Sequence, residues 1–345
     1  YPWVLVAHSQ YRNLPLIQIS EATGVWGVTF LIVLTAALLA ELIDPAVAHA
    51  AGRFGGRRSL SSAELARRIR LVGSRHSGRS RELLPTPSGG GGLQRLALFT
   101  VTLLLAAHLY GAVVLVAENR YPEPDEVTRV ALIQQNSDPR KHDYQRTFDS
   151  LKKLTNEALE KDPDLVVWSE TAFVPNIRRW GKEDPERYHL ARLVRRFRDY
   201  QRSIETWLLT GNDDYRRVLD DEGNEVDRLN YNAAVLLSDE GKRVETYHKI
   251  KLVPFTEHFP YEDEFPFVYN MLQEFDVHFW EPGEERTVFQ HPGFTFSTPI
   301  CFEDVFPDQV RRFVRAGAEV ILNISNDYWS LTEVQARMLP SPCAR

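Results

Sequence analysis

The side chains best suited to covalent chemistry in this 345-residue sequence are those of Glu170, Lys249 and Cys301. A cysteine nucleophile needs a base that takes its proton, and a carboxylate near a lysine can do so. The lysine ammonium can also stabilise a tetrahedral oxyanion, and the backbone amide of Phe302 can add a second donor. Each residue also has a structural alternative, with Glu170 as a solvated strand end, Lys249 as surface charge and Cys301 as a buried core cysteine.

The sequence shows none of the spacings that commonly hold a metal. Its ten histidines form no His-Glu-x-x-His motif, and its two cysteines, Cys301 and Cys343, form no Cys-x-x-Cys. We therefore predict no metal site and no cofactor. Two cysteines cannot build a disulfide framework, so Cys301 needs another role, and the sequence assigns none to Cys343.

The segment around Cys301 predicts a strand followed by a helix. Residues 294–300 alternate apolar and polar side chains, which is typical of a strand, and a helical pattern follows Pro307. A turn between a strand and a helix displays a nucleophile well. Because such a turn lies near the positive end of the helix, we expect the pKa of the Cys301 thiol to be lowered.

The polar part of the chain predicts an α/β domain with a mixed sheet. Helical patterns alternate with short apolar runs typical of buried strands, and one pair of runs is joined as a hairpin across residues 239–242. The predicted strands cover residues 130–133, 165–168, 207–211, 233–237, 244–247 and 320–324, and the predicted helices residues 148–159 and 186–202. In α/β folds the chemistry lies at the carboxyl ends of strands, where Glu170 is expected.

Two uncharged or nearly uncharged runs precede this domain. Residues 24–43 and 96–117 are long enough to span a bilayer, and the alternative is a pair of buried core helices. The arginine-rich residues 44–95 between them predict a cytoplasmic loop, which places residues 118–345 on the extracytoplasmic face. Such a basic run can also bind nucleic acid or acidic lipid, but the flanking spans account for it, so we predict no nucleic-acid partner.

An acidic, aromatic-rich stretch covers residues 260–282. On a domain attached to a membrane, this stretch can form a lid or a surface that touches lipid, because aromatic rings favour the membrane interface. A packed loop is the alternative.

Three short motifs resemble those of the nitrilase, or carbon-nitrogen hydrolase, superfamily and its Glu-Lys-Cys triad. They occur in that superfamily's order and at compatible spacing, as Trp168-Ser169-Glu170, Tyr247-His248-Lys249 with Val253-Pro254-Phe255, and Ile300-Cys301-Phe302-Glu303. Other segments are similar to the membrane-attached branch, the apolipoprotein N-acyltransferases. They are Tyr1-Pro2-Trp3, Ser9-Gln10, Thr23-Gly24-Val25-Trp26-Gly27-Val28, and Ser325-Asn326-Asp327 with Trp329.

The resemblance implies a nitrilase-like αββα sandwich attached to transmembrane helices, with Cys301 as nucleophile, Glu170 as general base and Lys249 as the cation that stabilises the oxyanion. It implies further support from residues beside this triad, namely Glu257, Phe302 and Glu303. Thr256 stands where the family usually has glycine, and Phe302 where it commonly has tyrosine.

The resemblance also implies a reaction. An acyl chain would pass from a phospholipid to Cys301 as a thioester, and then to the N-terminal diacylglyceryl-cysteine of an apolipoprotein, on the periplasmic face of a bacterial inner membrane. Two alternatives stay open, a membrane-tethered amidase of the nitrilase type and an inactive, truncated membrane protein. Residues 330–331 depart from the family's Phe-Gly, and we expect a fragment that lacks the first membrane helices and the C-terminal end.

Overall fold

The computed structural model describes residues 5–54, 90–118, 127–136, 142–262, 264–274 and 279–326. The chain divides into two compact units, one extending to Pro122 and the other beginning at Glu123.

The first unit consists of helices, of which α2 (Ser20–Phe54) and α4 (Gly90–Glu118) are the longest. Within them, Ser20–Ile43 and Gly92–Ala117 have a mean hydropathy of 2.1 each, and most of their side chains are not buried by protein. Both are therefore long and apolar enough to cross a membrane. They contain the two predicted spans.

Two details differ from the expected membrane region. Helix α2 bends at Gly24, whose φ of 63° lies in the left-handed region that favours glycine. Helical backbone continues to Phe54 and starts again at Gly90, so both ends of the predicted loop 44–95 are helical. Residues 55–89 of that loop lie outside the described residues.

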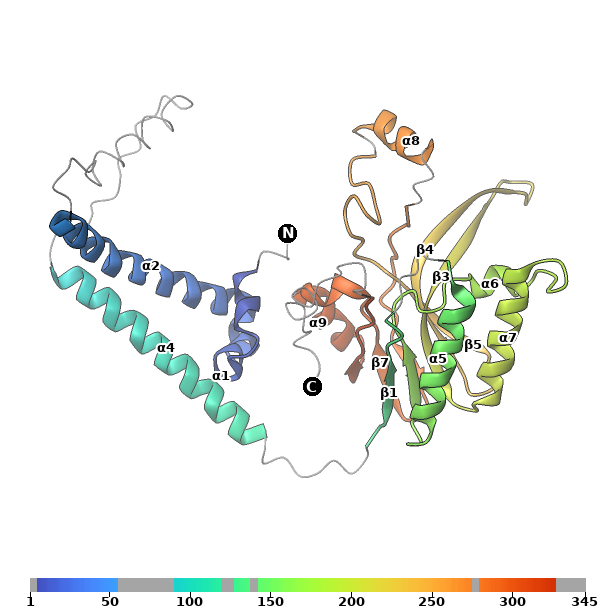
Figure 1. The fold of residues 1–345 in the computed structure, drawn as a ribbon, viewed down its shortest axis with the longest axis horizontal. Coiled ribbons are helices and arrows are strands. Elements are labelled where there is room, and N and C mark those ends of the chain that lie inside the picture. The colour runs from blue at the N-terminus through green and yellow to red at the C-terminus, as the bar shows by residue number, and fades with distance from the viewer. Residues whose placement is uncertain are drawn as a thin grey trace. The chain divides into compact units, whose positions relative to one another are not determined.

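The second unit is built on a five-stranded mixed sheet with the order β1-β2-β3-β4-β5 (Figure 1). Strands β1 to β3 pair in parallel, and β3 to β5 pair antiparallel, which confirms the predicted mixed sheet and the hairpin between β4 and β5. The strands are β1 (Val130–Ile133), β2 (Leu165–Trp168), β3 (Trp207–Leu219), β4 (Glu225–Leu237) and β5 (Arg243–His248).

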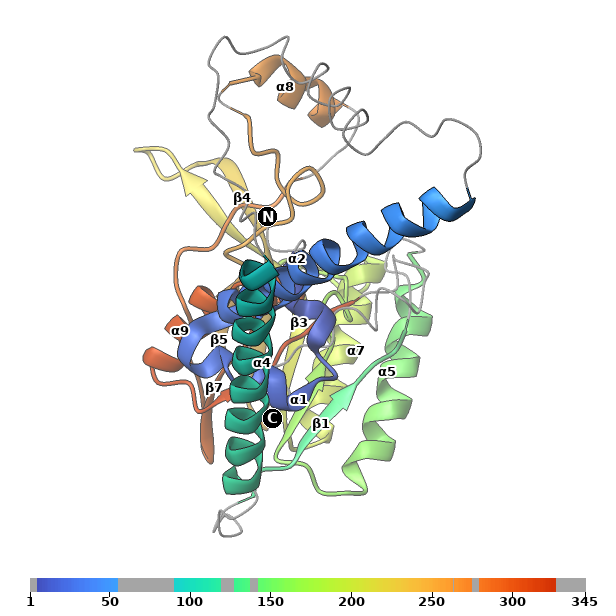
Figure 2. The ribbon, with the colours of Figure 1, turned by 90° about the vertical axis from the view of Figure 1, so that its left-hand side faces the viewer.

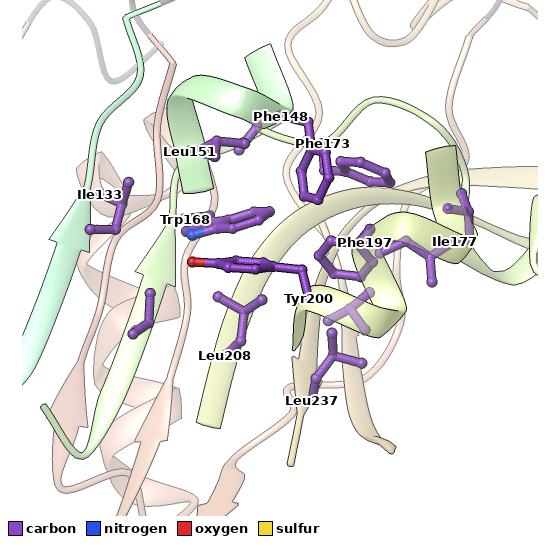
Figure 3. Close-up of a cluster of buried hydrophobic side chains, with 14 of the residues drawn as sticks. Ile133, Phe148, Leu151, Trp168, Phe173, Ile177, Phe197, Tyr200, Leu208 and Leu237 are labelled. Carbon is purple, nitrogen blue, oxygen red and sulfur yellow. The ribbon is translucent and has the colours of Figure 1, made fainter. Parts of the chain in front are cut away.

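Helices α5 (Tyr144–Leu159) and α7 (His189–Ser203) cover one face of this sheet. Figure 3 shows the apolar cluster between them and the strands, in which Phe148, Trp168 and Phe197 meet edge to face. The indole N–H of Trp168 donates to Thr155 Oγ1 at 2.9 Å, so its one polar group is satisfied within the core.

A three-stranded sheet, β6-β7-β8, lies against the opposite face, and α9 (Pro307–Arg315) lies on its outer side (Figure 1). Its strands are β6 (Phe289–His291), β7 (Phe294–Ser297) and β8 (Val320–Ile321). A second apolar cluster fills the space between the two sheets, which confirms the nitrilase-like αββα arrangement. The predicted strand 320–324 is shorter, because after Ile321 only Ile324 pairs again, as a single bridge to Ile300.

Helix α8 (Pro266–Glu274) forms within the aromatic-rich stretch and projects away from the two sheets (Figures 1 and 2). The side chains of Phe265, just before α8, and Phe267, within it, are 56% and 79% exposed. A packed loop therefore does not describe the part of the stretch that carries α8.

Gly211 on β3 allows the loop after β2 to approach closely. A Cβ at this position would lie 2.7 Å from the Glu170 Cα and at the same distance from the backbone of Ser169 and Thr171. All three contacts are with backbone, which cannot rotate away. Glycine at this position therefore allows the backbone of Glu170 to lie this close to β3, and any larger residue would push it away.

We expect Gly211→Ala to destabilise the full chain by about 1–3 kcal/mol through this overlap, measured by denaturant unfolding. Gly293→Ala is the matched control, because the nearest heavy atom to its Cβ would be 3.6 Å away. Equal unfolding midpoints for the two variants would contradict the close approach.

Candidate active site

The topology brings Glu170 and Lys249 to one edge of the large sheet. Glu170 follows β2 by two residues and Lys249 follows β5 directly. Strand β5 is antiparallel to β4, which is antiparallel to β3, so β5 runs in the direction of β2. The carboxyl ends of both strands therefore meet at the same edge, as the sequence predicted for Glu170.

Lys249 is completely buried and sits between two buried carboxylates. Its Nζ lies 2.8 Å from Glu257 Oε1 and 3.3 Å from Glu170 Oε1. Burial alone would lower the pKa of Lys249, but the negative charges of Glu170 and Glu257 outweigh burial and hold its pKa above the usual range. The ammonium is therefore charged at neutral pH.

Asn232 on β4 completes this cluster, and no sequence pattern pointed to it beyond a polar residue beside an apolar run. Its Nδ2 donates to Glu170 Oε1 at 2.9 Å and to Glu257 Oε1 at 3.3 Å. The remaining oxygens accept backbone N–H groups, from Val253 to Glu257 at 2.8 Å and from Asn326 to Glu170 at 3.3 Å. Both carboxylates are thus fixed in orientation on both oxygens.

Cys301 opens a short 3₁₀ helix, η4 (Cys301–Val305), directly after the Ile300 bridge. Its φ of 55° is unusual for a residue other than glycine. Hydrogen bonds to its backbone N–H and C=O stabilise this conformation. The Cys301 N–H donates to Ile324 O at 2.7 Å, and Asn323 Nδ2 donates to Cys301 O at 2.9 Å. The backbone around the thiol is therefore well determined.

The expectation of a lowered thiol pKa is wrong. Burial and the negative charge of Glu170 raise the pKa of Cys301, and the ammonium of Lys249 offsets only part of that effect. The thiol starts a single 3₁₀ turn rather than the longer helix α9, so the helix end does not compensate for its burial. Cys301 is consequently a neutral thiol at pH 7.

Glu303 joins the turn of Cys301 to the end of β5. Its Oε2 accepts the Ile300 N–H at 2.8 Å, and its Oε1 accepts the N–H groups of Ile250 and Lys251 at 2.9 and 2.8 Å. The Tyr247 hydroxyl donates to the same carboxylate at 2.9 Å. A single buried side chain therefore sets the position of the thiol relative to Lys249.

The structure brings all six predicted site residues together. Phe302 is buried with its ring centroid 5.5 Å from Lys249 Nζ, which is within range of a cation–π contact. Among the described residues, no group of three or more His, Cys, Asp or Glu side chains is arranged to hold a metal ion. The arrangement brings a thiol, a carboxylate and an oriented ammonium together in one buried place, which are the groups that nucleophilic catalysis needs.

Comparison with known families agrees with this geometry. The carbon-nitrogen hydrolase family profile matches residues 129–339, and the profile of the apolipoprotein N-acyltransferase N-terminal domain matches residues 1–38. The first match covers more than half of the chain, so the chain belongs to the carbon-nitrogen hydrolase family.

Similar proteins narrow the class. The chain is 36% identical over 343 residues to apolipoprotein N-acyltransferase 1 of Treponema pallidum (strain Nichols), and 34% identical over 352 residues to apolipoprotein N-acyltransferase 1 of Treponema denticola. These alignments cover 96% and 97% of this chain but 56% and 57% of the relatives, so the chain spans about half the length of the curated relatives it matches. Within its family, the chain is similar to the apolipoprotein N-acyltransferases.

Among solved structures, an amidase from Nesterenkonia sp. is 23% identical, with 64% of this chain and 73% of that chain covered. Its TM-score of 0.39 is too low to bear on the assignment, which rests on the family profiles and the relatives.

Replacing Lys249 tests whether its positive charge is needed to keep the carboxylates of Glu170 and Glu257 buried. Lys249→Met would leave two buried carboxylates facing each other without a cation, so we expect a loss of about 3–5 kcal/mol in the free energy of unfolding at pH 8. Lys242→Met is the control, because Lys242 is exposed and its ion pair with Glu240 is exposed too. A Lys249→Met protein as stable as the control would show that the carboxylates do not depend on Lys249.

Asp213 is a further acid near the cluster of Lys249, Glu170, Glu257 and Asn232, and no sequence pattern pointed to it. It pairs in register with Asn232, so both side chains lie on the same face of the sheet. Burial raises the pKa of Asp213 to about 7. Between pH 4 and pH 7 the folded chain therefore holds a proton that the unfolded chain has lost, and stability falls as the pH rises through this window.

Asp213→Asn should remove this dependence of stability on pH, because asparagine does not ionise. We expect the variant to be more stable than the parent by about 2 kcal/mol at pH 8 and equally stable at pH 4. Unfolding measured from pH 4 to pH 8, with exposed Asp221→Asn as the control, checks this expectation. A variant that is less stable than the parent at pH 8 would show that the charged carboxylate is the favoured form.

Proposed function

We propose that this chain carries the chemistry of a membrane-bound N-acyltransferase, which moves an acyl chain from a phospholipid, through a thioester on Cys301, to the N-terminal diacylglyceryl-cysteine of apolipoproteins. The observation that carries the proposal is the buried Lys249, held by Glu170 and Glu257 and close enough to Cys301 to alter the pKa of its thiol. The similar proteins are named apolipoprotein N-acyltransferases, and we take the acyl acceptor of the proposal from that name.

In the first step, Cys301 Sγ attacks the ester carbonyl of the phospholipid. Glu170 takes the thiol proton as the new C–S bond forms, because a thiol with a raised pKa is not ionised beforehand. Lys249 Nζ and the Phe302 amide donate to the developing oxyanion. The C–O bond then breaks, the leaving alkoxide takes the proton from Glu170, and a lysophospholipid departs from the acyl-enzyme.

In the second step, the amino group of the acceptor attacks the thioester carbonyl. Glu170 takes a proton from the attacking amine and returns it to the Cys301 sulfur as the C–S bond breaks. The products are an amide and the free thiol, so the enzyme is restored. Glu257 and Asn232 act on both steps by holding Lys249 and Glu170 in fixed orientations.

The same proposal places the domain beside a membrane. The two helices that are long and apolar enough to cross a bilayer support attachment, and an extracytoplasmic domain on a bacterial inner membrane would have both lipid substrates within reach. The exposed aromatic rings of Phe265 and Phe267 suit contact with the membrane interface. A membrane-tethered amidase would use the same three residues with water as the acyl acceptor.

The test is to incubate the full chain in detergent with a phospholipid that carries a labelled acyl chain and to measure the intact mass. We expect one acyl group per chain, released by hydroxylamine as a thioester is, and no label on Cys301→Ala. Cys343→Ser is the control and should acylate as the parent does.

Different outcomes separate the alternatives. An acyl group on Cys301→Ala would disprove the nucleophile, and hydrolysis of small amides without acylation by phospholipid would favour the amidase. A folded chain whose Cys301 reacts with neither substrate would identify an inactive protein.

A further inference from the structure

A cavity lies on the side of the large sheet that α7 covers, away from the face that carries Lys249. It has a volume of about 210 Å³ and is bounded by α6 (Ile177–Trp180), by α7 and by the start of β5. Half of the residues that line it are basic, namely Arg178, Lys182, Arg198, Arg202 and Arg243, and the others include the apolar Ile177, Phe197 and Leu237. We call it the basic cavity.

Few acids offset this charge. Asp214 lies 2.7 Å from Arg243 and 3.6 Å from Arg178, and Asp199 lies 3.8 Å from Arg202. Two carboxylates therefore face five cations among the described residues, which leaves three positive charges without a paired acid. An uncompensated positive charge in a concave site attracts an anion.

Arg198 is held in place at this wall before any ligand binds. Its guanidinium donates to Gly181 O at 3.2 Å and to Ile177 O at 3.3 Å. A Cβ at Gly181 would come within 2.2 Å of Arg198 Nη2, so only glycine lets the guanidinium pack there. Burial lowers the pKa of Arg198, and the nearby charge of Arg202 adds a smaller effect in the same direction.

Gln201 adds a neutral polar group to the same wall. It is 1% exposed, and its Nε2 donates to Ser238 O at 2.8 Å and to Thr206 O at 3.1 Å. Its Oε1 is buried and accepts no hydrogen bond from any residue that the structure describes. The wall therefore offers an acceptor for a hydroxyl as well as donors for an anion.

We propose that the basic cavity binds a phosphate group, as hydrogen phosphate or a phosphate monoester. Phosphate oxygens accept from the guanidinium and ammonium groups, and a hydroxyl on the phosphate or on its substituent donates to Gln201 Oε1. The site is independent of Cys301 and of the proposed acyl transfer. Its ligand can come from solution or from a lipid headgroup, and both sources present the same chemistry.

Calorimetric titration of the full chain in detergent with inorganic phosphate, at constant ionic strength, tests the proposal. Phosphate should bind, and chloride should not compete at equal ionic strength. The Lys182→Gln, Arg202→Gln double variant changes two exposed side chains of the wall, and we expect its affinity for phosphate to fall by at least about tenfold. Arg195→Gln, an exposed arginine of α7 outside the cavity, is the matched control and should bind as the parent does.

Binding of phosphate no stronger than that of chloride would overturn the site, as would equal affinities for the double variant and Arg195→Gln. Titration with glycerol 3-phosphate and with a short-chain phosphatidic acid distinguishes the two sources. Tighter binding of the first, lost in the double variant, assigns a soluble phosphate monoester. Tighter binding of the second, lost in the same variant, assigns a lipid headgroup.

Discussion

The buried ammonium of Lys249 is the constraint on which the rest of the site depends. Removing a charged lysine from water is costly, and the carboxylates of Glu170 and Glu257 offset that cost only if both are close and correctly oriented. These three residues come from three separate parts of the chain. The fold must therefore deliver the ends of β2 and β5 to the same edge of the sheet, and Asn232 must bridge the two carboxylates.

The position of Cys301 depends on the same end of β5. Glu303 accepts N–H groups from Ile250 and Lys251 on one side and from Ile300 on the other, so it couples the turn of the thiol to the segment that carries Lys249. This coupling explains why a residue with no part in the proton transfers is completely buried beside the site. It also places the thiol in surroundings that keep it neutral, and in the proposed mechanism Glu170 therefore takes the proton while the new bond forms.

The sequence predicted most of the framework because continuous apolar runs specify buried strands. Strands β1 and β2 begin and end where the apolar runs do, but only β2 is buried along its whole length. Strand β1 lies at the edge of the sheet with Leu132 71% exposed, so the expectation of a buried strand is wrong there. The six predicted site residues came from the order of the motifs. The outer half of the β3–β4 hairpin was missed, because Arg216, Arg217 and Arg228 carry charge where a strand pattern would show apolar residues. Asn232 and Asp213 were missed because their role depends on cross-strand register, which no local pattern reveals.

The direction of the Cys301 pKa shift shows the same limit. A cysteine before a helix suggests a stabilised thiolate, but burial and the charge of Glu170 come from distant segments and outweigh the local effect. Contacts from distant segments thus set the pKa of Cys301, although Cys301 was the site residue easiest to identify from the sequence.

The central claim is that Glu170 acts as the base for a neutral Cys301 thiol, and the rate of Cys301 alkylation by iodoacetamide at pH 7 tests it most directly. The measurement compares the parent with Glu170→Gln, each carrying Cys343→Ser so that a single thiol reacts. Since the charge of Glu170 raises the pKa of the thiol, its removal would speed alkylation if thiolate population alone set the rate. The account predicts the opposite, a fall of about 100-fold, because the base is lost. An equal or faster rate in Glu170→Gln would contradict it.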